Sequence, residues 1–303
     1  FSVEKCDELT VLVCSTISEP IDGKIRFEWV KKYFNYNPKI NVVHLDYNED
    51  KLPATSESNR DISRIWADFL TNKMPDINII FSSEPYGDFV AEYMDIEHIC
   101  FDEARNTIPI SATMIRENPF KYWMEMPENV RPYFAKKICL YGTESTGKST
   151  LTKILAEYFN TNYVPEMARD IIKKTDEVVF SDLIKIAELH AQTIIEKNKK
   201  ANRLLFIDTD INITRSYSSY LFQEELIVPN WIEKANKMDI YLFFSPDAPY
   251  IQDGTRLDKK ERLELHESHK RELDKRGISY FMINGENWEE RKNQAIGIVN
   301  DFI

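Results

Sequence analysis

Three things are scarce in this 303-residue chain: cysteine, positive charge and long apolar runs. The four cysteines show no CxxC spacing, which disfavours a disulfide framework or a cysteine-ligated metal and favours a reducing, cytoplasmic location. No apolar run approaches the roughly 18–20 residues that a membrane span needs, and no secretion signal is recognisable. The net charge of −11 disfavours general binding to nucleic-acid backbones. These absences leave a protein that acts on small molecules.

The length predicts two domains, at roughly 100–200 residues per domain. In the first half, short apolar runs that read as buried strands alternate with stretches of helical spacing, which predicts an α/β fold with a parallel sheet covered on both faces. The expected strands are 9–14, 40–45, 77–81 and 97–101, and the expected helices are 24–34 and 62–72. An aromatic segment at 120–135, broken by two prolines, reads as a packed connection, so we place the domains at 1–135 and 136–303.

The second half repeats the alternation and predicts a compact kinase core built on a five-stranded parallel sheet. The expected strands are 137–141, 162–164, 204–207, 239–244 and 280–283, and the expected helices are 148–159, 183–197 and 288–303.

Residues 142–149 read GTESTGKS and match the P-loop pattern G-x-x-x-x-G-K-[ST] in full. The glycines let the backbone curl so that N–H groups point at a phosphate, and the following helix adds the positive end of its dipole. We expect Lys148 to reach the β- and γ-phosphates and Ser149 to ligate Mg²⁺. Because the pattern follows an apolar strand and opens an amphipathic helix, it favours an ATP-dependent phosphotransferase over a glycine turn with a surface lysine. The predicted ATP-binding residues are Gly142, Thr143, Glu144, Ser145, Thr146, Gly147, Lys148, Ser149 and Thr150.

Acidic residues follow two of these strands. Asp208 and Asp210 end the run LLFIDTD, where an acid beside a P-loop holds Mg²⁺ or acts as a base, and an acidic cap is the structural alternative. Glu166 and Arg169 follow the strand at 162–164, at the sheet edge where α/β proteins bind ligands. Glu166 could accept from sugar hydroxyls and Arg169 could brace a phosphate, whereas a surface ion pair is the simpler explanation.

A charged helical stretch after residues 253–256 (DGTR) occupies the position of the lid in nucleoside and nucleotide kinases. A lid supplies arginines that neutralise charge on the transferring phosphoryl group, so Arg256 and Arg262 are candidates. Most of the other charges there are expected to be a solvated helix face. His266 and His269 share one helix face, but without cysteine or carboxylate partners they are not expected to bind metal.

The first half carries a motif of its own at residues 110–116, which read ISATMIR. This motif resembles the C-terminal signature of nucleotidylyltransferases, whose serine and arginine contact ATP phosphates; the serine would also cap the helix. Two neighbouring motifs support it, SSEPYG at 82–87 and DEAR at 102–105. The nucleotide-binding candidates are Ser83, Gly87, Asp102, Arg105, Ser111, Thr113 and Arg116.

The whole series of motifs resembles the NadR-type bifunctional proteins, which join a nicotinamide-nucleotide adenylyltransferase to a ribosylnicotinamide kinase. The resemblance implies that the second domain phosphorylates nicotinamide riboside, using ATP and Mg²⁺, to nicotinamide mononucleotide. It implies catalytic roles for Lys148, Asp208 and Arg256, a riboside site near Glu166, Arg169, Asp208 and Asp210, and metal binding by Ser149 and Asp208. Tyr163, Tyr217 and Trp231 could stack on the nicotinamide ring, and each could equally be a core residue. The first domain would use nicotinamide mononucleotide and ATP to make NAD.

One departure from the family pattern affects the first domain. The family's adenylyltransferase has an HxGH motif that stabilises phosphates, and the five histidines of this chain do not form it. Because the chain begins at Phe1 instead of Met, we expect a truncated Rossmann-like domain with poor adenylyltransferase activity. A different nucleoside kinase and an NAD-sensing regulator remain alternatives, and the oligomeric state, a homo-oligomer included, stays open.

Overall fold

The computed structural model describes residues 1–53, 59–172, 178–247 and 258–303, without the side chains of residues 169 and 170. The chain forms two compact units, Phe1–Tyr122 and Trp123–Ile303. Most of the aromatic connection expected at 120–135 therefore belongs to the second unit. No helix in the described ranges is long and apolar enough to cross a membrane.

The first unit alternates strands and helices, as the sequence predicts. Its elements are η1 (Ser2–Glu4), β1 (Leu9–Ser15), α1 (Gly23–Phe34), β2 (Ile40–Asp46), α2 (Arg60–Lys73), β3 (Ile79–Ser82), α3 (Tyr86–Met94), β4 (Glu97–Cys100) and α4 (Ala112–Glu117). In the described residues the strands form two parallel pairs, β1–β2 and β3–β4, where a single sheet was expected. Apolar periodicity predicts the type of each element but not its neighbours, and here a core centred on Leu52, Trp66, Ala67 and Val90 packs against side chains from both pairs.

The second unit is built on the expected five-stranded parallel sheet, with strand order β6-β7-β5-β8-β9. Its strands are β5 (Lys136–Tyr141), β6 (Asn162–Val164), β7 (Leu204–Asp208), β8 (Ile240–Phe244) and β9 (Phe281–Ile283). Its helices are η2 (Trp123–Glu125), α5 (Arg131–Phe134), α6 (Lys148–Tyr158), α7 (Ala168–Ile171), α8 (Phe180–Asn198), α9 (Ile211–Phe222), α10 (Asn230–Ala235), α11 (Lys259–Lys275) and α12 (Trp288–Phe302).

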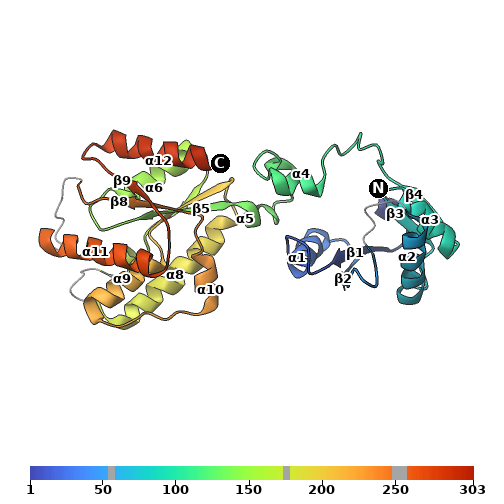
Figure 1. Ribbon diagram of the computed structural model, residues 1–303, viewed down its shortest axis with the longest axis horizontal. Coiled ribbons are helices and arrows are strands. Elements are labelled where there is room, and N and C mark those ends of the chain that lie inside the picture. The colour runs from blue at the N-terminus through green and yellow to red at the C-terminus, as the bar shows by residue number, and fades with distance from the viewer. Residues whose placement is uncertain (54–58, 173–177, 248–257) are drawn as a thin grey trace. The chain divides into compact units, whose positions relative to one another are not determined.

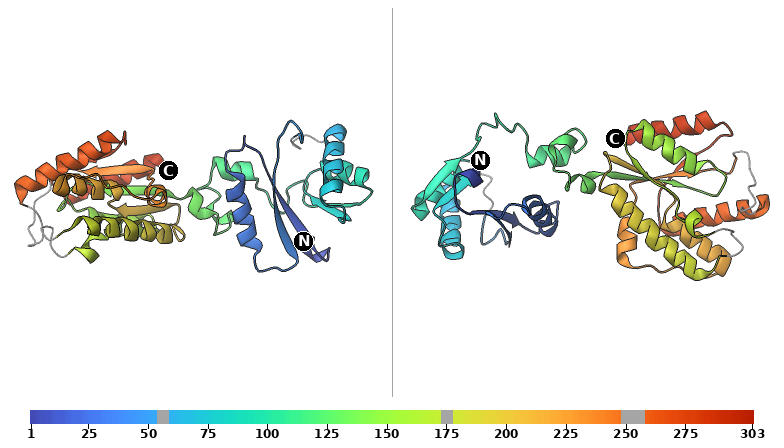
Figure 2. Two further views of the ribbon diagram at one scale, coloured as in Figure 1. Left: turned by 90° about the horizontal axis from the view of Figure 1, so that it is seen from below. Right: turned by 180° about the vertical axis from the view of Figure 1, so that it is seen from behind.

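Helices cover both faces of this sheet. Helices α6 and α12 lie on one face, and α8, α9 and α11 lie on the other (Figure 1), an arrangement that the other views repeat (Figure 2). Strands β7 and β8 are buried along their whole length, which explains why their sequences are continuously apolar. The central strand β5 leads directly into the P-loop, so the loop lies at the carboxyl edge of the sheet.

Candidate functional site

The P-loop has the strand-to-helix setting that its sequence predicts, between β5 and α6. Gly142 and Gly147 have φ angles of +132° and +85°, and Ser145 between them has φ +57°. A Cβ atom on Gly142 would lie 2.7 Å from the carbonyl oxygen of Phe244. Glycine is therefore required here both for the backbone conformation and for the close approach of β8.

The lysine of the loop is almost fully enclosed. Lys148 is the first residue of α6, is 7% exposed, and its Nζ donates to the Thr143 carbonyl oxygen at 2.6 Å. The Thr146 hydroxyl donates to the same oxygen at 2.8 Å. The ammonium group is thus held inside the curve of the loop, where it can interact with phosphates.

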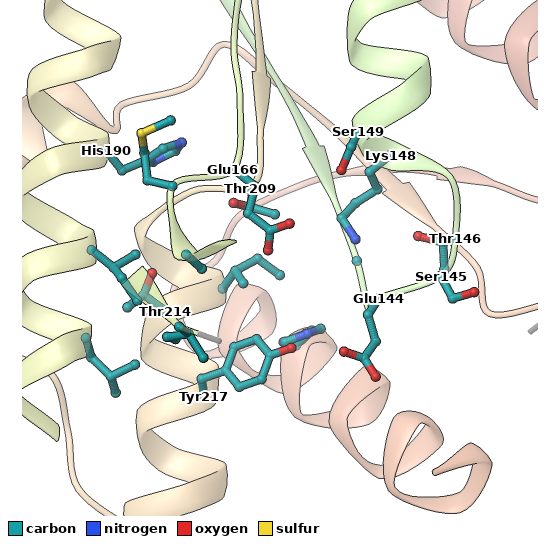
Figure 3. A pocket seen from close by; sticks show the side chains of 18 of the residues that line it. Glu144, Ser145, Thr146, Lys148, Ser149, Glu166, His190, Thr209, Thr214 and Tyr217 are labelled. Carbon is teal, nitrogen blue, oxygen red and sulfur yellow. The ribbon is translucent and has the colours of Figure 1, made fainter. Parts of the chain in front are cut away.

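A cavity of about 540 Å³ extends from the P-loop toward α8 and α9. The loop lines one end, and the opposite end is mostly apolar, with Met167, Leu183, Ile186 and Ile213 in its wall. The side chains of Glu144 and Tyr217 point toward each other across the cavity (Figure 3). A cavity of this size, with polar groups at one end, is typical of a small-molecule site.

Tyr217 and Tyr163, two of the aromatic candidates for stacking, do line cavities. Tyr217 lies in the large cavity, where burial and then the negative charges of Glu144 and Glu166 raise its pKa well above 10, so its hydroxyl stays protonated. Tyr163 lies in a smaller one. The third candidate, Trp231, is 39% exposed on α10 and lines neither cavity.

The smaller cavity, of about 130 Å³, gathers oxygen-bearing side chains that were predicted to bind metal, to bind the riboside or to act in catalysis. Ser149, Glu166 and Asp208 line it, at the carboxyl ends of β6 and β7 and the start of α6. Asp208 is 1% exposed. The structure thus brings together residues that lie far apart in the sequence, because parallel strands end at the same sheet edge.

Asp210, two residues after Asp208, has different surroundings. Its carboxylate caps α9, accepting from the backbone N–H groups of Asn212 and Ile213 at 2.9 and 3.3 Å, and it accepts from the Tyr241 hydroxyl at 2.6 Å. It lines neither cavity. Burial raises its pKa from 3.8 to about 6, against the opposing effect of these hydrogen bonds. In this structure Asp210 is a helix cap, and its predicted contact with the riboside stays a prediction.

This buried carboxyl predicts that stability falls as the pH rises from 4 to 6. In that range the folded state keeps a proton on Asp210 that the unfolded state has lost. The stabilisation from this bound proton is complete below the pKa of the unfolded state, 3.8. It is lost as the pH rises through the pKa of the folded state, about 6. Relative to Asp210→Asn, the parent should lose about 2–2.5 kcal/mol of unfolding free energy between pH 4 and pH 7. Urea unfolding of both proteins at these two pH values measures this loss. A difference that does not change with pH would contradict the assignment.

His190, on α8, lines the large cavity and is not among the residues predicted from the sequence. It is 4% exposed, its ring donates to the backbone carbonyl of Asp208, and burial lowers its pKa from 6.5 to about 4. It is therefore neutral at pH 7. Its Nε2 atom has no hydrogen-bond partner among the described residues. A lone histidine on an amphipathic helix carries no local signal that distinguishes it from a core residue.

Of the two arginines expected on the lid, the structure describes Arg262 and not Arg256. Arg256, and the side chain of Arg169, lie outside the described residues. Arg262 was expected on the lid, but it is 2% exposed and donates to the Glu144 carbonyl at 3.0 Å, so it packs beneath the P-loop.

His269 lines the large cavity and is fully buried, which lowers its pKa well below 6.5. The part of the chain that the structure describes contains no cluster of His, Cys, Asp and Glu suited to a metal ion.

In the first unit, the residues of ISATMIR form a helix start. Ser111 caps α4, its hydroxyl accepting from the Met114 N–H at 3.2 Å. Arg116 donates to the Thr113 hydroxyl at 2.9 Å and remains exposed. The expected capping role of Ser111 is thus present, and the nucleotide-binding roles of these residues stay predictions.

The loop before α4 is shaped by Asp102 and Arg105. The Asp102 carboxylate accepts from the N–H groups of Thr107 and Ile108 at 2.9 and 2.7 Å. These bonds, led by the one from Thr107, lower the pKa of Asp102. Arg105 donates to the Ile110 carbonyl at 3.4 Å. Both residues therefore have a local structural role.

Gly87, in the first turn of α3, lies against a hydrogen-bonded pair of side chains. Ser82 and His98 are joined by a hydrogen bond of 2.9 Å, and a Cβ on Gly87 would lie 2.3 Å from His98 Nε2. Ser83 is exposed. Close packing against this pair gives Gly87 a structural role, and the predicted nucleotide contacts of Gly87 and Ser83 stay predictions.

Substitution of Gly147 by alanine should weaken both the fold and nucleotide binding. The φ of +85° is unfavourable for alanine, and its Cβ would lie 2.5 Å from Trp288. We expect a loss of about 2–3 kcal/mol in unfolding free energy, measured by urea denaturation. Gly277→Ala is the matched control, since Gly277 has φ +63° but nothing within 4 Å of its Cβ. Equal losses in the two variants would rule out the contact with Trp288 as a cause.

Comparisons with known proteins agree with this geometry. A family model for the AAA domain matches residues 137–291. The trifunctional NAD biosynthesis/regulator protein NadR of Escherichia coli is 30% identical over 294 residues, covering 92% of this chain and 69% of that protein. Its Salmonella typhimurium counterpart is 33% identical over 253 residues, covering 80% of this chain and 60% of that protein.

Solved structures show the same fold over the whole chain. A crystal structure of NadR protein with NAD and AMP-PNP aligns with 99% of this chain and 90% of its own, at 22% identity and a TM-score of 0.78. A crystal structure of NadR protein with NR aligns with 99% of this chain and 89% of its own, at 23% identity and the same TM-score. The resemblance predicted from the motifs is confirmed, and the chain belongs to the NadR family of NAD biosynthesis/regulator proteins.

Proposed function

We propose that the second unit transfers the γ-phosphoryl group of ATP to the 5′-hydroxyl of nicotinamide riboside, forming nicotinamide mononucleotide for NAD salvage. The observation that carries this proposal is the continuity of one 540 Å³ cavity from the P-loop to an apolar wall beside Tyr217. ATP phosphates would lie at the loop and the riboside at the other end. The NadR name of the relatives, and the NadR crystal structures with AMP-PNP and with NR, support this choice of substrates.

Three residues that line the two cavities have chemical roles in this proposal. Lys148 would neutralise the β- and γ-phosphate oxygens, and Glu166 would accept from ribose hydroxyls. Asp208 would take the proton of the 5′-hydroxyl as its oxygen bonds to the γ-phosphorus and the bond to the departing ADP oxygen breaks.

The residues also fit a magnesium ion. The Ser149 hydroxyl and the Asp208 carboxylate line the same small cavity, and both supply the oxygen ligands that Mg²⁺ prefers. Mg²⁺ commonly takes only one or two protein ligands and completes its shell with phosphate oxygens and water. When bound, the ion would neutralise charge that develops on the phosphates.

Acceptor specificity tests the proposal directly. Steady-state phosphorylation should be efficient with nicotinamide riboside and at least about 100-fold lower in kcat/KM with adenosine, cytidine or thymidine, since a shaped pocket discriminates by contacts in the transition state. Formation of ADP and of each monophosphate is followed by chromatography. If another nucleoside is phosphorylated and nicotinamide riboside is not, the chain is a different nucleoside kinase.

The first unit is the candidate adenylyltransferase of the family. The 303 residues contain no HxGH, so we expect them to form NAD from nicotinamide mononucleotide and ATP only poorly. Calorimetry of NAD with the full chain separates a catalytic role from a sensing role, because a sensor would bind NAD tightly without turnover.

A further inference from the structure

Two arginines lie buried on the outer side of the P-loop; one was a lid candidate, and the other was not selected from the sequence. Arg262 comes from α11 and Arg291 from α12, and their exposed fractions are 2% and 1%. Charged side chains this deeply buried require compensating polar contacts. The contacts of these two point to the P-loop.

Arg262 binds two successive carbonyl groups of the loop. Its Nε donates to the Glu144 oxygen at 3.0 Å and its Nη2 to the Ser145 oxygen at 3.4 Å. Its Nη1 donates to the Pro246 oxygen at 3.1 Å, after β8. One guanidinium therefore joins the phosphate loop to the neighbouring strand end.

Arg291 binds the carbonyl of the next loop residue, Thr146. Its Nη1 donates to the Thr146 oxygen at 3.1 Å and its Nη2 to the Ser245 oxygen at 3.0 Å. It also forms an ion pair with Asp247 and donates through Nε to the Gly285 oxygen. Together the two arginines hold three consecutive carbonyls of the loop.

Holding these carbonyls determines where the loop's N–H groups point. In a planar trans peptide, the C=O of one residue and the N–H of the next point in opposite directions. The carbonyls of residues 144, 145 and 146 face the guanidinium groups, so the N–H groups of Ser145, Thr146 and Gly147 face away from them. They therefore point into the loop, and the inward-pointing N–H groups of a P-loop are the ones that bind phosphate.

We propose that Arg262 and Arg291 are positioning residues for ATP, which orient the peptide planes of residues 144–147 so that the loop is ready for phosphate. They act through the backbone and do not touch the nucleotide. The proposal rests on the proposed function only in that the loop binds ATP. A direct measurement of ATP binding therefore tests it whatever the acceptor is.

The test compares ATP affinity in the full chain, by calorimetry with the non-hydrolysed analogue AMP-PNP and Mg²⁺. Arg262→Met and Arg291→Met should each weaken binding about tenfold, the scale of a lost charge-assisted hydrogen-bond set. Arg262→Lys and Arg291→Lys should recover part of it, because an ammonium group can still reach one carbonyl but not two. Nicotinamide riboside affinity should stay within about twofold of the parent, because the acceptor end of the cavity is unchanged.

Arg215→Met is the matched control, since Arg215, on α9, is 5% exposed and donates to the Leu226 carbonyl, away from the loop. It should lower the melting temperature but leave AMP-PNP affinity within about twofold. The proposal is overturned if folded Arg262 and Arg291 variants bind AMP-PNP like the parent, or if Arg215→Met loses as much affinity. If the methionine variants do not fold, the lysine variants decide: a loss of at least about threefold is expected, and parental affinity would contradict the proposal.

If the loop binds AMP-PNP but no nicotinamide riboside is phosphorylated, the proposed function fails and the positioning role of the arginines stands. If AMP-PNP does not bind to the parent protein, both fail. The two proposals thus have separate outcomes.

Discussion

Replacement of Lys148 by alanine should abolish phosphoryl transfer while the protein stays folded. The ammonium group is the cation that the structure places within the curve of the loop, and its bond to the Thr143 carbonyl is available for exchange with phosphate. Loss of such a preorganised charge lowers kcat about 10²–10³-fold. We expect a decrease of at least about 10³-fold, because the γ-phosphoryl group carries full negative charge. The measurement is steady-state formation of nicotinamide mononucleotide.

Lys185→Ala is the matched control for this variant. Lys185 lies on α8 of the same unit, is 63% exposed and pairs with Asp182 at 3.0 Å. It should retain parental activity, because an exposed ion pair contributes little. Full activity of Lys148→Ala would show that the loop does not bind the phosphates as proposed.

Asp208→Asn should lower kcat severely and leave ATP binding largely intact. An amide cannot take the proton of the 5′-hydroxyl, and general base catalysis contributes about 10²–10⁴ to the rate. The side chain is nearly isosteric, so the buried end of β7, where Asp208 is 1% exposed, should keep its packing. Turnover is measured with nicotinamide riboside, and ATP affinity is measured separately by calorimetry.

Asp239→Asn serves as the control for charge removal from the same sheet. Asp239 lies just before β8, at the opposite edge of the sheet, where it accepts from Lys136 at 2.9 Å. Its kcat should match the parent. An Asp208→Asn protein that turns over normally would remove Asp208 from catalysis and leave Glu166, the other acid that lines the small cavity, as the candidate base.

The pair Asp208 and Asp210 shows where sequence reasoning reached its limit. Both follow an apolar strand, and nothing in the run LLFIDTD separates a reactive carboxylate from a cap. In the fold, Asp208 lies at the end of β7 beside the small cavity, and Asp210 lies at the N-terminus of α9 and accepts its first N–H groups. Two carboxylates that are two positions apart thus have different surroundings, one beside a cavity and one at a helix start.

The arginines of the second unit show the same limit. Arg262 lies in a run of charges that is typical of a solvated helix face, yet α11 buries it under the P-loop. Arg291 lies 145 residues from the carbonyl that it binds, and no spacing rule connects them. Helical periodicity cannot reveal such contacts, because their partners are backbone atoms of a distant loop.

The sequence by itself determined the α/β class, the five strands of the second unit, and the P-loop with its lysine. These follow from local rules: apolar periodicity, the backbone freedom of glycine, and the chemistry of one short motif. The tertiary structure decided which acids meet Ser149, which arginines hold the loop, and how the described strands of the first unit pair. Such facts depend on which elements pack together, because burial and hydrogen bonding between distant segments exist only once the chain has folded.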